Sequence, residues 1–164
     1  MRTSTWACIG FLLSMTSAVA GGSASRGTDA DSAAIKETLL NYVEGWYEGS
    51  AVRMQRALSP ELAKRIVQKN PKTGKEYLEE MTADELVTGT ESDGGCAADS
   101  NESRPECTLI PKERQQKDIT IFDIYEDDAS AKVVFLGWVD YVHLARINGR
   151  WVIVNVLWQE KPRA

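Results

Sequence analysis

The chain has 164 residues, of which 43% are hydrophobic, and its 19 basic and 24 acidic residues give a formal net charge of −5. This length favours one domain with a substantial core. An acidic chain without a basic run is not expected to bind nucleic acid or an anionic membrane surface.

Residues 1–20 have the pattern of an export signal. Arg2 gives a short basic start, residues 6–15 form an apolar run, and Ala18-Val19-Ala20 matches a small-x-small cleavage site. The apolar run is too short to anchor the chain in a bilayer. We predict cleavage after Ala20 and a periplasmic or secreted mature protein that is not attached to a membrane.

The rest of the chain reads as one domain with one long polar insertion. Residues 21–28 form a flexible, small-residue lead-in, the folded domain is expected over 29–160, and 161–164 form a tail. A polar loop at 89–117 interrupts the domain, and loops of this length are often functional or disordered.

Two cysteines lie in that polar loop. Cleavage would remove Cys8 and leave Cys96 and Cys107, which in an exported chain are expected to form a disulfide. A zinc site is not expected, because two thiolates need further ligands and His143 is the only histidine. We expect neither a metal nor a cofactor, since no phosphate loop or dinucleotide motif is present.

A first helix is predicted to begin between Asp29 and Ser32 and to end at Gly49-Ser50. Its apolar residues fall on one face of a 3.6-residue period: Ile35, Leu39, Tyr42, Val43 and Trp46. A short second helix is predicted over 51–57, capped by Ser50, with Val52 and Leu58 buried.

The next segments alternate turn and helix signals. The type of structure at 61–67 stays open, and 70–74 (NPKTG) is a turn by composition. Tyr77, Leu78 and Met81 suggest a helical patch. Thr82-Ala83-Asp84-Glu85 fits a capping box, so another helix is predicted to start at Ala83.

The carboxyl-terminal third is rich in strand signals. A strand is predicted over 118–125, followed by an acidic turn and a long hairpin over 130–159 that closes at Asn148-Gly149. As one strand, 130–146 would be about 55 Å long, so it must bend, and Gly137 is the expected place for a bulge or kink.

The two-residue turn fixes a predicted register for this hairpin. His143 faces Val154 on one face, while Asp140, Val142 and Asn155 share the other. Both faces of the second strand are apolar, so one face is expected to meet helices and the other a second copy of the chain. The order of elements predicts an α+β fold with helices on one face of a curved antiparallel sheet.

Several strings resemble the nuclear-transport-factor-two-like superfamily, and within it the family described as putative lumazine-binding. They are 45–50 (GWYEGS), 58–65 (LSPELAKR), 131–133, 139–144 and 147–155. The resemblance covers about residues 31–160 apart from the polar loop. It implies a cone with an internal pocket between the helices and the concave sheet, and a homodimer formed through the sheet.

The resemblance leaves the activity open, because the superfamily includes ketosteroid isomerases, polyketide cyclases, dehydratases and non-catalytic binding modules. One departure concerns the residue before Pro60. Relatives often carry histidine there and this chain has Ser59, so no role of that histidine transfers.

Asp140 is the first candidate functional residue. A carboxyl group in mid-strand among apolar neighbours is not expected to be buried without a partner. It is either a general acid or base activated by desolvation, or a structural group that bonds a helix end or a tyrosine hydroxyl. His143 lies on the opposite face of a regular strand, so a structural role is favoured for it.

We expect an exported domain that binds a small apolar or aromatic ligand, or another protein, without catalysis. The pocket would be lined by Tyr42, Trp46, Asp140, Val142 and Asn155. The alternative is a cofactor-independent isomerase, cyclase or dehydratase, with Asp140 as general base and Tyr42 or Asn155 steadying an oxyanion. A third possibility is a purely structural dimer with a filled interior.

Overall fold

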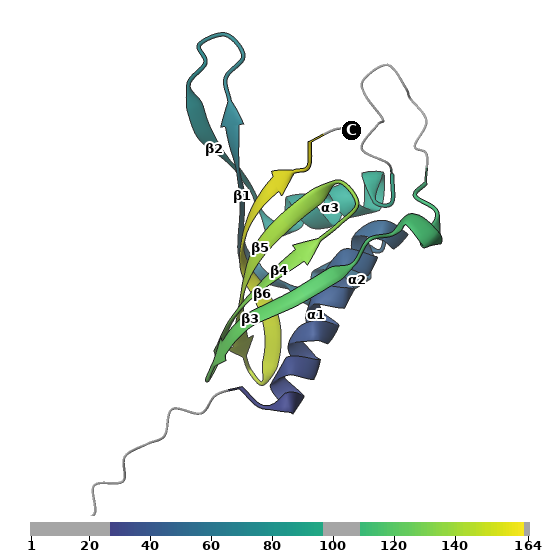
Figure 1. Cartoon of the computed structure of the whole chain (residues 1–164), viewed down its shortest axis with the longest axis vertical. Helices are drawn as coiled ribbons and strands as arrows, with labels where there is room; N and C mark the ends of the chain where they lie inside the picture. Colours follow the sequence, from purple (N-terminus) through teal and green to yellow (C-terminus); the bar gives the residue numbers. More distant parts are fainter. Residues whose placement is uncertain (1–26, 97–108, 163–164) are drawn as a thin grey trace, which may run out of the picture.

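The computed structural model describes residues 27–96 and 109–162 (Figure 1). The signal at 1–20, residues 21–26 of the lead-in and Cys107 lie outside the described residues. In chain order the described residues form α1 (Asp29–Glu48), α2 (Ala51–Ala57), β1 (Leu58–Lys69), β2 (Glu76–Met81), α3 (Ala83–Asp93), a 3-10 turn (Lys112–Arg114), β3 (Asp118–Tyr125), β4 (Asp128–Val134), β5 (Trp138–Ile147) and β6 (Arg150–Glu160).

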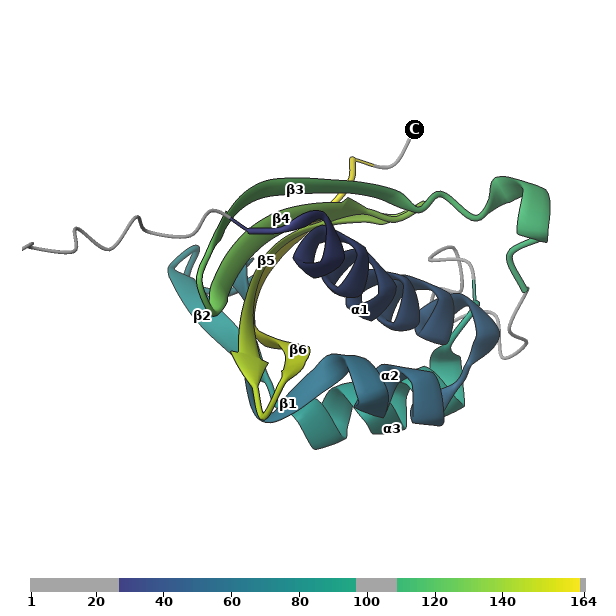
Figure 2. The same cartoon turned by 90° about the horizontal axis from the view of Figure 1, so that it is seen from below.

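The strands form one six-stranded sheet in the order β2-β1-β6-β5-β4-β3. The sheet curves around α1, with α2 and α3 beside it on the same concave side (Figure 2). The predicted α+β architecture is therefore confirmed. The expectation of a wholly antiparallel sheet is wrong in one place, because β1 follows α2 and runs parallel to β6. No helix in the described part of the chain is long and apolar enough to cross a membrane.

Side-chain caps fix the ends of the helices. Thr28, one residue before the predicted range, caps α1 and forms a capping box with Asp31. Gly49 ends α1 in the left-handed conformation, at φ 62°. Thr82 and Glu85 form the predicted capping box, and α3 starts at Ala83 as expected. It runs on to Asp93, so the polar insertion begins later than predicted.

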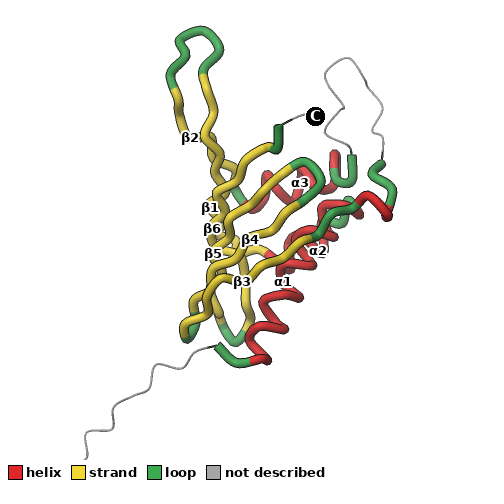
Figure 3. Tube along the Cα trace, in the orientation of Figure 1, coloured by secondary structure: helices red, strands yellow, loops and turns green. Residues whose placement is uncertain are grey.

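The segment between α2 and α3 is a β-ribbon, not a helix. β1 and β2 pair antiparallel, and their far ends project beyond the sheet (Figure 3). The helical patch predicted from Tyr77, Leu78 and Met81 is wrong. Almost all of β2 is exposed, so it has no buried face and its sequence lacks the apolar alternation that marks a strand.

The long run at 130–146 reverses direction instead of bending. β4 ends at Val134, β5 begins at Trp138, and the two pair antiparallel across the turn that contains Gly137. The Phe135 amide donates to the Trp138 carbonyl and closes this turn. The predicted site of the irregularity is correct, but the predicted bulge is a complete chain reversal.

The β5–β6 hairpin starts in the predicted register and then shifts by one residue. Ile147 pairs with Arg150 and Leu144 with Ile153, but His143 pairs with Asn155. Val154 is therefore the extra residue of a β-bulge. The predicted pairing of His143 with Val154 is wrong. From the bulge onward, every side chain of β6 lies on the face opposite to the one predicted for it.

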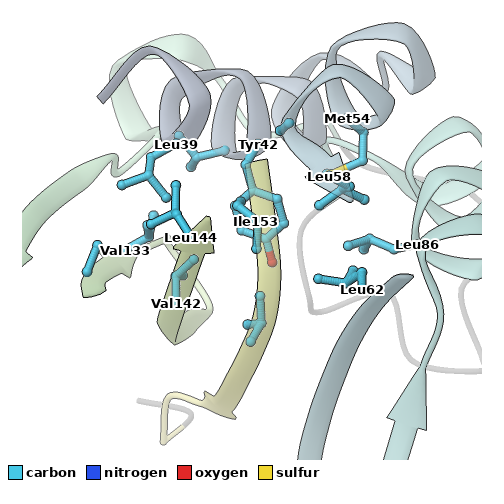
Figure 4. Close-up of a cluster of buried hydrophobic side chains, with 14 of the residues drawn as sticks. Leu39, Tyr42, Met54, Leu58, Leu62, Leu86, Val133, Val142, Leu144 and Ile153 are labelled. Atoms are coloured by element: carbon cyan, nitrogen blue, oxygen red, sulfur yellow. The ribbon is translucent and has the colours of Figure 1, made fainter. Parts of the chain in front are cut away.

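The core fills the space between the helices and the concave face of the sheet (Figure 4). Leu39 and Tyr42 of α1 meet Val133, Val142, Leu144 and Ile153 of the sheet, while Met54, Leu58, Leu62 and Leu86 form the adjoining part. Leu58 is buried as predicted. Val52 is 68% exposed, so its predicted burial is wrong, because α2 turns its Met54 side inward.

Candidate functional site

A cavity of about 100 Å³ lies between the helices and the sheet, beside the core. The three α-helices and four strands, β1, β2, β5 and β6, contribute to its lining. The lining residues are Tyr42, Trp46, Met54, Lys64, Met81, Leu86, Phe135, Trp138, Asp140 and Trp158. Apart from Lys64 and Asp140 these side chains are apolar or aromatic, as is usual for small-molecule sites.

Lys64 and Asp140 form a buried ion pair in the wall of the cavity. The Lys64 Nζ lies 2.9 Å from the Asp140 Oδ2, and the two residues are 6% and 1% exposed. The Tyr42 hydroxyl donates to the same Oδ2 at 2.5 Å and accepts from Lys64 at 2.9 Å. The three polar groups come from three elements, α1, β1 and β5, and each bonds the other two.

Strand alternation explains why a lysine points inward. Leu62, Lys64 and Ile66 are every second residue of β1, and all three are buried. The Lys64 ammonium also lies 4.7 Å from the centre of the Trp158 ring, a cation–π contact that replaces part of its lost hydration. The sequence analysis did not identify Lys64 as a site residue. Leu62 and Ile66, two positions before and after it, would have indicated that its side chain lies on the core face of a strand.

Burial changes the proton equilibria of this cluster. Burial, the negative charge of Asp140 and the hydrogen bond to it hold the pKa of Tyr42 well above its usual value. Burial lowers the pKa of Lys64, and the charge and hydrogen bond of Asp140 oppose that shift. Tyr42 is therefore a neutral donor near pH 7.

Two buried polar atoms of the lining have no hydrogen-bond partner among the described residues. They are the Nε1 of Trp46 and the Oδ1 of Asp140. Oδ2 of the same carboxylate already accepts two hydrogen bonds. Oδ2 of Asp140 is thus bonded within the protein, whereas Oδ1 is buried without a hydrogen bond to any described residue.

Aromatic side chains form much of the rest of the cavity wall. Trp46 and Trp138 pack edge to face with ring centres 5.6 Å apart, and Tyr42 and Phe135 do the same at 5.5 Å. The Tyr47 hydroxyl accepts from the Leu136 amide and donates to the Gln116 carbonyl, which fixes the turn that carries Phe135. The wall is therefore assembled from rings with restricted freedom.

The predicted pocket residues divide into two groups. Tyr42, Trp46 and Asp140 are together in the cavity lining. Val142 is buried in the core but does not line the cavity. Asn155 was expected to share the face of Asp140, and this placement is wrong. The Val154 bulge turns Asn155 to the outer face, where it lies 3.3 Å from His143 and accepts from Arg65.

His143 lies on the opposite face from Asp140, as predicted. It borders a shallow hollow of about 340 Å³ with Asp123, Tyr125 and Asp128. The described residues contain no group of three or more histidine, cysteine or acidic side chains placed to hold a metal ion. Cys96 lies in the described part and Cys107 does not, so their disulfide stays a prediction.

A family model described as putative lumazine-binding matches residues 30–159, most of the chain. The chain belongs to this putative lumazine-binding family. The family name refers to a small ligand and does not mention a reaction. No curated protein matches the chain.

Solved structures show the same fold as this member of the putative lumazine-binding family. Three are described as NTF2-like proteins of unknown function. That of Silicibacter pomeroyi is 15% identical over 82% of this chain and 99% of its own, with a TM-score of 0.61. Those of Shewanella baltica and Methylobacillus flagellatus are 21% and 19% identical, cover 84% and 82% of this chain and 99% and 95% of their own, and have TM-scores of 0.57 and 0.59. The fold that the resemblance to nuclear-transport-factor-two-like proteins implied is thus confirmed.

Proposed function

We propose that this protein binds a small, largely apolar molecule in the cavity between its helices and sheet, without catalysis. The observation that carries the proposal is an apolar, aromatic cavity beside a closed Lys64–Asp140–Tyr42 cluster. Lys64 neutralises the charge of Asp140, and the Oδ2 of Asp140 accepts hydrogen bonds from Tyr42 and Lys64. Such a cluster fixes the shape of a site more readily than it moves protons.

The test is to block the cavity. Small aromatic molecules are titrated into the protein, and the thermal midpoint and Kd are measured. Met81→Trp adds a bulky ring at the half-buried rim and should weaken binding at least tenfold. Tyr77→Trp, on the exposed part of the same strand, is the matched control and should leave Kd unchanged. If neither the purified protein nor the titrations show any bound small molecule at millimolar concentration, the proposal is wrong.

A cofactor-independent enzyme is the second candidate, and one observation supports it. Oδ1 of Asp140, a side chain of the cavity lining, has no hydrogen-bond donor among the described residues, so the carboxylate keeps an unused acceptor that a general base requires. Asp140→Asn would then abolish turnover of any substrate found. The binding proposal expects this variant to change affinity and stability only.

We further propose that the mature protein is exported with residues 1–20 removed and carries a Cys96–Cys107 disulfide. Leu109 forms an antiparallel bridge with Cys96, so Cys96 lies beside a residue only two positions from Cys107 in the sequence. Mass spectrometry of the secreted protein should find Gly21 at the amino terminus and no free thiol. An intact Met1 or two titratable cysteines would each remove one part of this proposal.

We also propose that the protein forms a homodimer through the outer face of the sheet. Five exposed apolar side chains cross this face, and we call them the outer row: Leu78, Val67, Leu157, Tyr141 and Phe122. Val67 pairs with Leu78 and Tyr141 with Leu157, and the Tyr141 and Phe122 rings stack at 6.3 Å. The row spans the sheet from β2 to β3, and a second copy would offer the same apolar row to it.

A further inference from the structure

A positively charged turn ends the β1–β2 ribbon. Lys69, Lys72 and Lys75 lie in or beside this turn, at the end of the ribbon that projects beyond the sheet (Figure 3). We call these three residues the lysine tip. All three are exposed, and none forms an ion pair with a described residue. Glu76 pairs with Lys69 across the ribbon, so the three positive charges face a single carboxylate and the tip stays net positive.

Hydrogen bonds hold the lysine tip in one shape. The Asn70 side chain accepts from the amides of Lys72 and Thr73. The Asn70 amide donates to the Lys75 carbonyl, and the Asn70 carbonyl accepts from the amide of Gly74, which has φ 70°. A turn fixed in this way loses little backbone freedom when it binds a partner.

The shallow hollow that His143 borders on the outer face has the opposite charge. Its lining contains the carboxylates of Asp123 and Asp128 and no lysine or arginine, and we call it the acidic hollow. Neither carboxylate forms an ion pair with a described residue. Tyr125 and Val154 add apolar surface to the same lining. A lysine side chain suits such a hollow, because its stem packs on apolar groups while its ammonium reaches a carboxylate.

The outer row connects the lysine tip to the acidic hollow. At one end of the row, Val67 precedes Lys69 by two residues, so both lie on the same face of β1. At the other end, Phe122 directly precedes Asp123, which pairs with Ser130 of the hollow. Each copy of the chain therefore has an apolar strip with positive charge at one end and negative charge at the other.

Two-fold symmetry allows two ways to lay one such strip on another. If the axis runs along the row, each residue lies over its own counterpart, and lysine tip meets lysine tip. If the axis crosses the row at right angles, the strips lie antiparallel and each tip meets the hollow of the other copy. Like charges placed together across an interface oppose binding, whereas opposite charges favour it. The charges of the outer face therefore favour the antiparallel arrangement.

We propose that the two outer rows of the homodimer lie antiparallel, with the lysine tip of each copy bound in the acidic hollow of the other. This inference rests on the proposed homodimer and adds its orientation and the charged contacts that fix it. The apolar row supplies the buried surface, and the two tip-to-hollow contacts select one arrangement of it.

Charge reversal at either end of the row tests the orientation. The tip variant carries Lys72→Glu and Lys75→Glu, and the hollow variant carries Asp123→Lys and Asp128→Lys. Each should raise the dimer Kd at least tenfold in sedimentation velocity of the mature protein, because like charges then meet at both contacts. All four changes in one chain restore opposite charges, and should return the Kd to within about threefold of the wild type.

A variant with the same change in net charge is the control. Lys36→Glu and Arg56→Glu reverse two exposed residues of α1 and α2, which lie on the concave side of the sheet (Figure 2). This variant should keep the wild-type Kd. The thermal midpoint of each variant shows that it is folded.

Carbodiimide cross-linking locates the contacts independently. This reagent joins a carboxylate to an amine in direct contact, and a mixture of ¹⁵N-labelled and unlabelled protein distinguishes links between copies from links within one. Mass spectrometry should find links from Lys72 or Lys75 of one copy to Asp123 or Asp128 of the other. Links between copies at other places only would overturn the proposed orientation.

The outcomes separate this inference from the homodimer proposal. If the tip and hollow variants keep the wild-type Kd while Leu157→Lys raises it, the outer row forms the dimer but the antiparallel orientation is wrong. A four-residue variant that dimerises as weakly as the tip variant, or a control variant that is weakened as much, also overturns the orientation alone. If the wild type is a monomer at every concentration, both proposals fail.

Discussion

Lys64 and Asp140 lie 76 residues apart in the chain and form an ion pair of 2.9 Å that is almost fully buried. The pair joins β1 to β5 across β6, and both of its side chains hydrogen-bond to the Tyr42 hydroxyl. Removing two charges from water costs more than a hydrophobic pair of the same size would. A structural explanation alone is therefore weak, and the position of the pair at a cavity favours a role in shaping a binding site.

The first prediction concerns the asymmetry of this pair. Lys64→Met leaves the Asp140 carboxylate buried without its counter-ion and should lower the free energy of unfolding by about 3–5 kcal/mol. The double variant Lys64→Met/Asp140→Leu should recover most of this loss. Urea unfolding measures both values.

The neighbouring residue supplies the control for that measurement. Arg65 points to the other face of β1 and pairs with Glu80, where both side chains are well exposed. Arg65→Met should cost less than about 1 kcal/mol. Equal losses for Lys64→Met and Arg65→Met would show that burial does not strengthen the Lys64–Asp140 pair.

The second prediction concerns alkaline pH and Tyr42. Its pKa is raised above 10.0 in the folded protein, so above about pH 10 the unfolded state loses the phenol proton and the folded state keeps it. The stability of the wild type should therefore fall with rising pH there, with a contribution from Tyr42 of about 1.4 kcal/mol per pH unit. Tyr42→Phe should cost about 1–2 kcal/mol at pH 7, and the gap to the wild type should shrink above pH 10.

The exposed tyrosine of β3 is the control for this titration. Tyr125→Phe removes the hydroxyl of a side chain that is 52% exposed and does not line the cavity. Urea unfolding of the wild type and both variants from pH 7 to pH 11 gives the comparison. A gap between Tyr42→Phe and the wild type that stays constant up to pH 11 would contradict the raised pKa.

Local signals in the sequence were enough for most of the fold. Capping boxes, the Gly49 helix end and the Asn148-Gly149 turn depend on interactions within a few residues, and the sequence displays them directly. β2 gave no such signal, because a strand exposed on both faces needs no apolar alternation.

The site was only partly predictable for a different reason. Tyr42, Trp46 and Asp140 follow from simple periodicity, whereas the place of Asn155 depends on the unpaired Val154. A single bulged residue reverses the faces of all later side chains, and its position is set by the tertiary packing of β6 on α1 and β1. Lys64 could be placed only after β1 was recognised as a strand.

The third prediction concerns two helix glycines with different backbone needs. Gly49 has φ 62°, and an added Cβ would meet its nearest neighbour, the Thr90 carbonyl oxygen, at an ordinary 3.6 Å. Gly49→Ala should therefore cost about 1–2 kcal/mol from backbone strain alone. Gly89 lies within α3 with no atom within 4 Å of an added Cβ, so Gly89→Ala should gain about 0.5–1 kcal/mol. Thermal and urea unfolding should give opposite signs, and a loss in Gly89→Ala would contradict the assignment of α3.

The last prediction concerns the outer row and the proposed dimer. Leu157 lies near the middle of this row on β6 and is 46% exposed. In a dimer formed through this face, a lysine there would place two like charges close together and desolvate them. Leu157→Lys should therefore raise the dimer Kd at least tenfold.

Sedimentation velocity over a range of concentrations measures this change. Val52→Lys is the matched control, because Val52 is more exposed than Leu157 but lies on α2, away from the outer face of the sheet. It should leave the mass distribution unchanged, since the introduced charge stays in water. A wild type that sediments as a monomer at every concentration, or a Val52→Lys variant that dissociates as Leu157→Lys does, would show that the outer row is not the dimer interface.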